Sequence, residues 1–268
     1  MKKLFFITTS IIVFLISQSC KNKIEFKDSL MEMNKPSYLL KDSSAWNSVE
    51  EKYFRLHISN SIEDDKFSDE LRLTQQRVFN HLFRLMEIEE QLDTLPKVDI
   101  FVFKDIDEKY LKTQVQASAH ALPPYYAAYY VKDNAEGAHE ITHILDSHFW
   151  SPFSNGKFGM LLNEGFSFYS DEGIIFKFDY YEKAKKILKN EDYQISKIIS
   201  SAAGNSYEKK AFVSGAFVKY LIENFGINKF KELWLEVNKE KMSISVFDDI
   251  YNQPFDDLEK RFYKQIGL

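Results

Sequence analysis

The chain has 268 residues, with 35 lysines and arginines against 40 aspartates and glutamates, and a formal net charge of −5. This balance excludes a basic nucleic-acid surface, because binding a phosphate backbone needs clustered positive charge. The length is generous for one domain and tight for two, and the 24 phenylalanines and 15 tyrosines suit a large apolar core.

The amino terminus has the pattern of an export signal. Lys2 and Lys3 precede an apolar run, Leu4–Ile16, that is too short for a comfortable membrane span. Small residues then lead to Cys20, the only cysteine in the sequence. The segment resembles a bacterial lipoprotein signal, which implies cleavage of residues 1–19, acylation of Cys20 and attachment to a membrane of the cell envelope. An ordinary secretory signal and an uncleaved anchor are the alternatives.

The next part of the chain predicts a tether followed by one domain. Residues 20–45 are polar and mixed, which favours a lipid-anchored tether, and we expect residues 46–268 to form a single domain. Glu51–Ser59 alternates with the period of a strand. Glu63–Asp65 then open a helix, whose apolar stripe is formed by Phe67, Leu71, Val78, Leu82 and Leu85.

Two later segments complete the predicted sheet. Lys97–Phe103, introduced by Pro96, is a strand, and the apolar, aromatic stretch Ala119–Val131 should contain another. Beyond it the pattern is almost wholly helical. The sequence therefore predicts an α+β fold of two lobes, with a small N-terminal sheet and one long helix, then a mostly helical lobe, and a cleft between the lobes.

The segment His139–His143 carries the clearest chemical signal, because it reads H-E-x-x-H. On a helix, residues four apart share a face, so the two imidazoles can hold one metal ion while Glu140 acts on a water molecule. The alternative is a helix with two surface histidines and a solvated glutamate. Ile141 and Ile144 argue against it, because they give the helix an apolar face.

A zinc hydrolase site needs a third protein ligand. The metzincin pattern fails, because Asp146 replaces its glycine and Phe149 its third histidine, and His148 misses that position by one residue. Glu164 follows a segment rich in helix breakers and lies among apolar residues, where an unpaired carboxylate is costly. We therefore expect Glu164 to be the third ligand; an exposed helix carboxylate is the alternative reading.

The combination of His139-Glu140-x-x-His143 with Asn163-Glu164-Gly165 resembles the gluzincin peptidases, the group of thermolysin and the zinc aminopeptidases. The segment Tyr207–Leu221 is similar to a helix of small gluzincin-like domains, and Phe247–Phe262 to their closing segment, although Gln253 replaces a usual glycine. The exopeptidase motif G-x-M-E-N is not visible, so the resemblance favours an endopeptidase.

The resemblance implies a zincin fold, one zinc ion and roles for several residues. Glu140 would move the proton of the attacking water, Tyr207 would stabilise the oxyanion, and Asp146 and Asp171 are candidates for orienting a histidine. The strand before the metal helix would form the edge that pairs with an extended polypeptide substrate, or would merely close the sheet. The residues expected at that edge are Tyr125, Tyr126, Ala127, Ala128 and Tyr129.

These features favour a lipid-anchored zinc endopeptidase, expected to be a monomer that acts on unstructured polypeptide. The alternative function is a binding or assembly lipoprotein that keeps the fold and has lost turnover. The complete set of His139, Glu140, His143 and Glu164 favours the enzyme, because an inactive relative needs none of them.

Overall fold

The computed structural model describes residues 31–172, 174, 179–190, 194–200, 206–239 and 243–268. The expected signal peptide and Cys20 lie outside the described residues. The fold is α+β, as predicted, and the chain divides into two compact units. Among the described residues, unit 1 contains those up to Arg77 and Thr94–Glu136, and unit 2 contains Val78–Asp93 and those from Gly137 onward.

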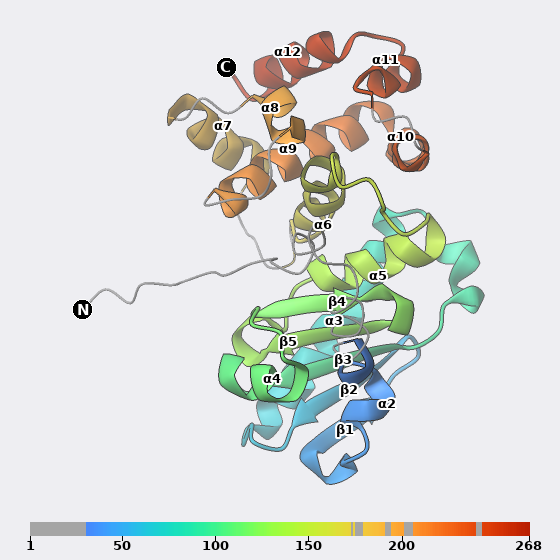
Figure 1. Cartoon of the computed structure of the whole chain (residues 1–268), viewed down its shortest axis with the longest axis vertical. Helices are drawn as coiled ribbons and strands as arrows, with labels where there is room; N and C mark the ends of the chain where they lie inside the picture. The colour runs from blue at the N-terminus through green and yellow to red at the C-terminus, as the bar shows by residue number, and fades with distance from the viewer. Residues whose placement is uncertain (1–30, 173, 175–178, 191–193, 201–205, 240–242) are drawn as a thin grey trace, which may run out of the picture. The chain divides into compact units, whose positions relative to one another are not determined.

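Unit 1 is built on a five-stranded mixed sheet with the order β1-β2-β3-β5-β4 (Figure 1). The central strands β2, β3 and β5 are parallel, and the outer strands β1 and β4 each run antiparallel to their neighbour. Their bounds are β1 Trp46–Glu50, β2 Phe54–Ser59, β3 Val98–Phe103, β4 Ala119–Leu122 and β5 Ala127–Val131. The predicted strands at 51–59 and 97–103 are thus confirmed as β2 and β3.

The prediction that Tyr125–Tyr129 form a substrate-pairing edge is wrong. The stretch 119–131 contains two strands, because Pro123 and Pro124 begin a 3₁₀ turn that reverses the chain. The second strand, β5, hydrogen-bonds to β3 on one side and to β4 on the other. All five residues of β5 are buried. A continuously apolar strand is typical of such an interior position, and β4 forms the edge instead.

Residues 34–45 pack within unit 1 and do not form the predicted tether. Asn34 donates a hydrogen bond from Nδ2 to the carbonyl of Thr113 at 2.8 Å, and its own carbonyl accepts one from the Tyr129 hydroxyl. Leu39 is buried with Trp46, whose indole N–H donates to the Leu39 carbonyl at 3.1 Å. The short helix α2 (Pro36–Leu39) therefore belongs to the folded part of unit 1, and the predicted tether boundary at residue 45 is too late.

The remaining regular elements are helical, and every regular element after β5 in the described ranges is a helix. The long helix predicted after Glu63 is confirmed as α3 (Asp65–Leu85). No helix among the described residues is both long and apolar enough to cross a membrane. The other α-helices among the described residues are α4 Ile106–Thr113, α5 His139–Phe149, α6 Gly165–Ser170, α7 Tyr180–Asn190, α8 Ile195–Ser200, α9 Tyr207–Phe225, α10 Ile227–Asn238, α11 Ser245–Tyr251 and α12 Phe255–Gln265.

The helix α9 forms the centre of unit 2, and α6 packs closely against it (Figure 1). A Cβ atom placed on Gly165 would lie 3.0 Å from the backbone carbonyl of Ser214 and 3.0 Å from a methyl group of Val218. A side chain at position 165 would therefore push α6 away from α9. Since Gly165 directly follows Glu164, this contact also restrains the backbone that carries that carboxylate.

We expect Gly165→Ala to lower the free energy of unfolding by about 1–3 kcal/mol, the usual cost of overpacking. Gly159→Ala is the matched control, because a Cβ at Gly159 meets nothing within 4 Å. Denaturant unfolding of both variants beside the wild type checks the prediction. Equal midpoints for the Gly165 variant and the wild type would contradict this packing.

Candidate metal centre

The helix α5 presents His139 and His143 on one face, four residues apart. Ile141, Ile144 and Leu145 on its other faces are fully buried and hold the helix in unit 2. The N-cap residue of α5, Ala138, makes no side-chain hydrogen bond to the first turn of the helix. Asp171 fills this role from the end of α6, because its Oδ1 accepts the backbone N–H of Ala138 at 2.6 Å and that of His139 at 3.2 Å.

Glu164 comes from the end of a π-helical segment, Gly159–Glu164, that runs directly into α6. Leu161 and Leu162 in this segment are fully buried. A π-helical turn widens the spacing of side chains and is frequent at functional sites. Here it precedes α6, and Glu164 lies at the junction.

The three predicted ligands come together in unit 2 with one donor atom each, all within 4.8 Å of one another. The Nε2 atoms of His139 and His143 are 3.2 Å apart. A Glu164 oxygen lies 3.6 Å from His139 Nε2, and the other lies 3.9 Å from His143 Nε2. Two nitrogen ligands of one tetrahedral zinc ion are separated by roughly 3.3 Å, given Zn–N bonds of about 2.0–2.1 Å. The donor set therefore fits a single ion of this size.

The ring of His143 is oriented from its other nitrogen. Its Nδ1 lies 3.2 Å from Asn163 Oδ1 and 3.2 Å from Ser167 Oγ. A proton on Nδ1 can be donated to Asn163, which leaves the Nε2 lone pair facing Glu164 and His139. The sequence analysis did not identify Ser167 and used Asn163 only as part of a motif. The available signal was their spacing from Glu164, because Asn163 precedes it by one residue and Ser167 follows it by three.

The charges of the group favour a cation between the three donors. Burial alone would lower the pKa of His139, but the hydrogen bond to Glu164 and the nearby carboxylates, among them Glu140, raise it to about 9. Burial would raise the pKa of Glu164, but the two histidines lower it to about 2. Burial lowers the pKa of His143 to about 4. One proton, mainly on His139, thus holds a position that a metal ion would take.

The donors are covered without being sealed off. The side chains of His139, His143 and Glu164 are 19%, 15% and 20% exposed. Glu140 is also only partly buried, at the first turn of α5. A water molecule or a substrate group can therefore reach the donors, which a catalytic metal site requires and a closed structural site does not.

Tyr207, the candidate oxyanion donor, lies at the first position of α9 and donates its hydroxyl proton to Glu164 Oε2. The structure therefore brings Tyr207 to the metal group, as a partner of a ligand. Its ring also meets Phe168 edge-on, with ring centroids 6.3 Å apart. The hydroxyl is positioned by this packing and by the carboxylate together.

The two predicted histidine-orienting carboxylates occupy other positions. Asp171 binds backbone amides at the start of α5 and not an imidazole. Asp146 is 2% exposed and its Oδ2 has no hydrogen-bond partner among the described residues. Burial raises the pKa of Asp146 well above its ordinary value. His148 packs its ring edge-on against Phe149, with centroids 4.6 Å apart, and does not belong to the metal group.

Comparison of the sequence with protein-family models and with curated proteins gave no match.

Proposed function

We propose that this protein is a zinc-dependent peptidase of the gluzincin type, most simply an endopeptidase. The observation that carries the proposal is the meeting of His139 Nε2, His143 Nε2 and the Glu164 carboxylate, with Glu140 beside the first ligand on the same helix. Two imidazoles and one carboxylate are a common catalytic zinc ligand set, which leaves one coordination position for chemistry.

His139, His143 and Glu164 would hold the zinc ion, which when bound supplies a Lewis acid that polarises the scissile carbonyl and acidifies water. Glu140 would take the proton from the attacking water and then donate it to the leaving amine. Tyr207 would donate to the developing oxyanion, exchanging its bond to Glu164 for one to the substrate oxygen. Asn163 and Asp171 would keep the imidazoles and the helix start in place.

The proposed substrate is an extended polypeptide, bound in a cleft of the two-lobed zincin arrangement. Recognition through main-chain hydrogen bonds tolerates many sequences, so we expect a broad preference.

Hydrolysis of a quenched peptide library by the zinc-loaded protein tests the function. Activity should disappear on chelation and return with zinc. A zinc-loaded protein that cleaves nothing in a broad library would instead favour the catalytically silent binding lipoprotein.

Zinc affinity should rise with pH by about tenfold per unit between roughly pH 7 and 8.5, because one bound proton must leave. The pKa of His139, raised to about 9, keeps that proton on the metal-free site throughout this range. Two ordinary histidines, with a pKa of about 6.5, would be deprotonated already and give a flat profile. Competition titrations against a zinc indicator, at several pH values, measure the slope.

We further propose that lipid on Cys20 attaches the enzyme to a membrane of the bacterial cell envelope. The proposal is supported by Lys2, Lys3 and the apolar run before Cys20. Cys20→Ala should abolish metabolic labelling with palmitate and leave the signal uncut or the protein misplaced. Equal labelling of the mutant and the wild type would rule out this anchor.

A further inference from the structure

A second group of reactive side chains lies across three strands of unit 1. Ser48 Oγ on β1 is 2.8 Å from His57 Nδ1 on β2, and His57 Nε2 is 3.0 Å from Asp99 Oδ1 on β3. Ser48 is exposed, whereas His57 and Asp99 are only 4% and 3% exposed. An exposed hydroxyl therefore ends a hydrogen-bonded chain that begins at a buried carboxylate. None of these residues belongs to the metal group.

The register of the sheet brings the serine and the histidine together. Ser48 lies directly opposite His57 in the antiparallel pair of β1 and β2. The backbone N–H of Glu51 donates to the Phe54 carbonyl at 2.9 Å, so the alternation of the ladder makes Ser48 and His57 a non-hydrogen-bonded pair. Side chains are closest in such pairs, and the backbone N–H of Ser48 faces away from β2, toward the edge of the sheet.

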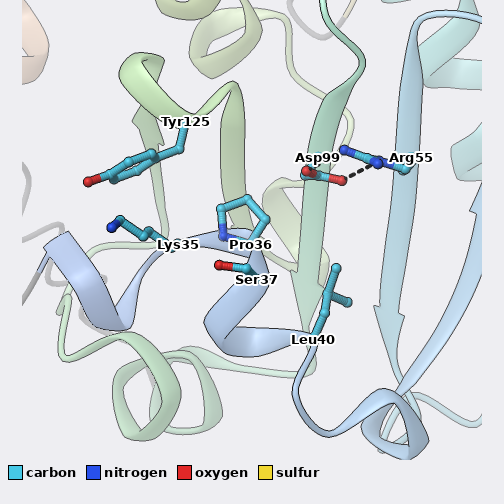
Figure 2. Close-up of a pocket in the computed structure, with 7 residues that line it drawn as sticks. All are labelled: Lys35, Pro36, Ser37, Leu40, Arg55, Asp99 and Tyr125. Atoms are coloured by element: carbon cyan, nitrogen blue, oxygen red, sulfur yellow. Dashed lines mark hydrogen bonds and ion pairs between the residues drawn. The ribbon is translucent and has the colours of Figure 1, made fainter.

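The carboxylate fixes the tautomer of His57. Asp99 accepts two hydrogen bonds from Arg55, from Nε at 2.7 Å and Nη2 at 2.9 Å, and Figure 2 shows this pair. A carboxylate in such a pair is an acceptor, so His57 Nε2 carries the proton and donates it to Asp99. The Nδ1 atom is then left as an acceptor, and the Ser48 hydroxyl donates to it. The ring of Phe101, stacked at 4.7 Å, restrains the imidazole.

We propose that Ser48 is an activated nucleophile that is acylated by esters and other activated acyl donors. A serine on a histidine that is itself held by a carboxylate is the general arrangement for nucleophilic catalysis. Ser48 Oγ forms a bond to the acyl carbon while His57 Nδ1 takes the hydroxyl proton. The bond from that carbon to the leaving oxygen then breaks, and the leaving oxygen receives the proton from His57. No redox partner is needed.

Two features of unit 1 define how this serine reacts. The backbone N–H of Ser48 faces the open side of the edge strand β1, where it can donate to the oxyanion of an acyl donor that approaches from the edge of the sheet. The positive charge of Arg55 offsets part of the negative charge of Asp99. Asp99 therefore stabilises the imidazolium of His57 less than a carboxylate without an arginine partner would. We therefore expect acylation to be slower than in an efficient serine hydrolase and the acyl group to persist.

A fluorophosphonate probe tests the proposal, because the serine oxygen forms a bond to phosphorus as fluoride leaves. The full-length protein is labelled in the presence of a zinc chelator, so the result does not depend on the proposed peptidase. Peptide mass mapping compares Ser48 with Ser44, an exposed serine whose hydroxyl donates to Asp42 at 2.6 Å without a histidine. General-base assistance predicts labelling of Ser48 faster by about 100-fold or more.

Variants separate activation from mere exposure. His57→Gln and Asp99→Asn should slow labelling at position 48 severely, Ser48→Ala should abolish it, and Ser44→Ala should leave it unchanged. Circular dichroism identifies variants that do not fold. The comparison of Ser48 with Ser44 in the wild type needs no variant, so labelling of Ser48 no faster than that of Ser44 overturns the proposal.

Discussion

Alanine at position 139, 143 or 164 should remove the bound zinc, lowering occupancy from about one ion per chain to near zero. Each substitution takes one of the three donors that lie within 4.8 Å of one another. The loss should exceed the roughly 10–100-fold in metal affinity that loss of a supporting partner costs. Metal analysis of His139→Ala, His143→Ala and Glu164→Ala after equilibration with zinc measures the effect.

His148→Ala is the matched control, since His148 lies on α5 and contributes no donor to the group. It should retain full zinc. Asn163→Ala should fall between the two, because it removes the partner of His143 Nδ1 and leaves the ligands themselves. If Glu164→Ala retains zinc at wild-type affinity, Glu164 is not a ligand and the gluzincin assignment fails.

Glu140→Gln should keep the fold and the zinc and still lose peptidase activity by about 10²–10⁴-fold, the usual contribution of general-base catalysis. Glutamine has the shape of glutamate but accepts no proton at neutral pH. Glu140 is not in the group of donor atoms, so the ion should not depend on it. Zinc content and hydrolysis of the quenched library are measured on the same preparation.

Two results would contradict this role. Loss of zinc with the activity would make Glu140 a ligand, and unchanged hydrolysis would assign the activity to a different group. The Ser48 group in unit 1 is then the first to test, by repeating the assay with the chelator present.

Local patterns predicted the elements whose residues are neighbours in sequence. The alternation around His57 gave β2, and the four-residue spacing of His139 and His143 gave a helix with both rings on one face. The position of Glu164 beside the two histidines was predicted from the cost of burying a carboxylate without partners. In each case the signal is contained within a few residues or in the cost of burying one group.

Long-range pairing was not available from such patterns. The interior position of β5 depends on β3 and β4 together, although the two prolines before Tyr125 did mark a turn. Asn34 is held in unit 1 by a hydrogen bond to Thr113, 79 residues away. The polar sequence around Asn34 contains no sign of this partner, and it therefore predicted a tether. Asp171 caps a helix that begins 32 residues earlier, and nothing in its neighbours distinguishes a backbone partner from an imidazole.

X-ray absorption at the zinc edge of the loaded wild-type protein identifies the ligands of the ion. If two imidazoles and one carboxylate hold a single zinc ion in unit 2, the spectrum should show nitrogen and oxygen neighbours at about 2.0–2.1 Å, with the outer-shell signature of two imidazoles and no sulfur. A spectrum without imidazole scattering, or a protein that fails to retain zinc after dialysis, would contradict this ligand set.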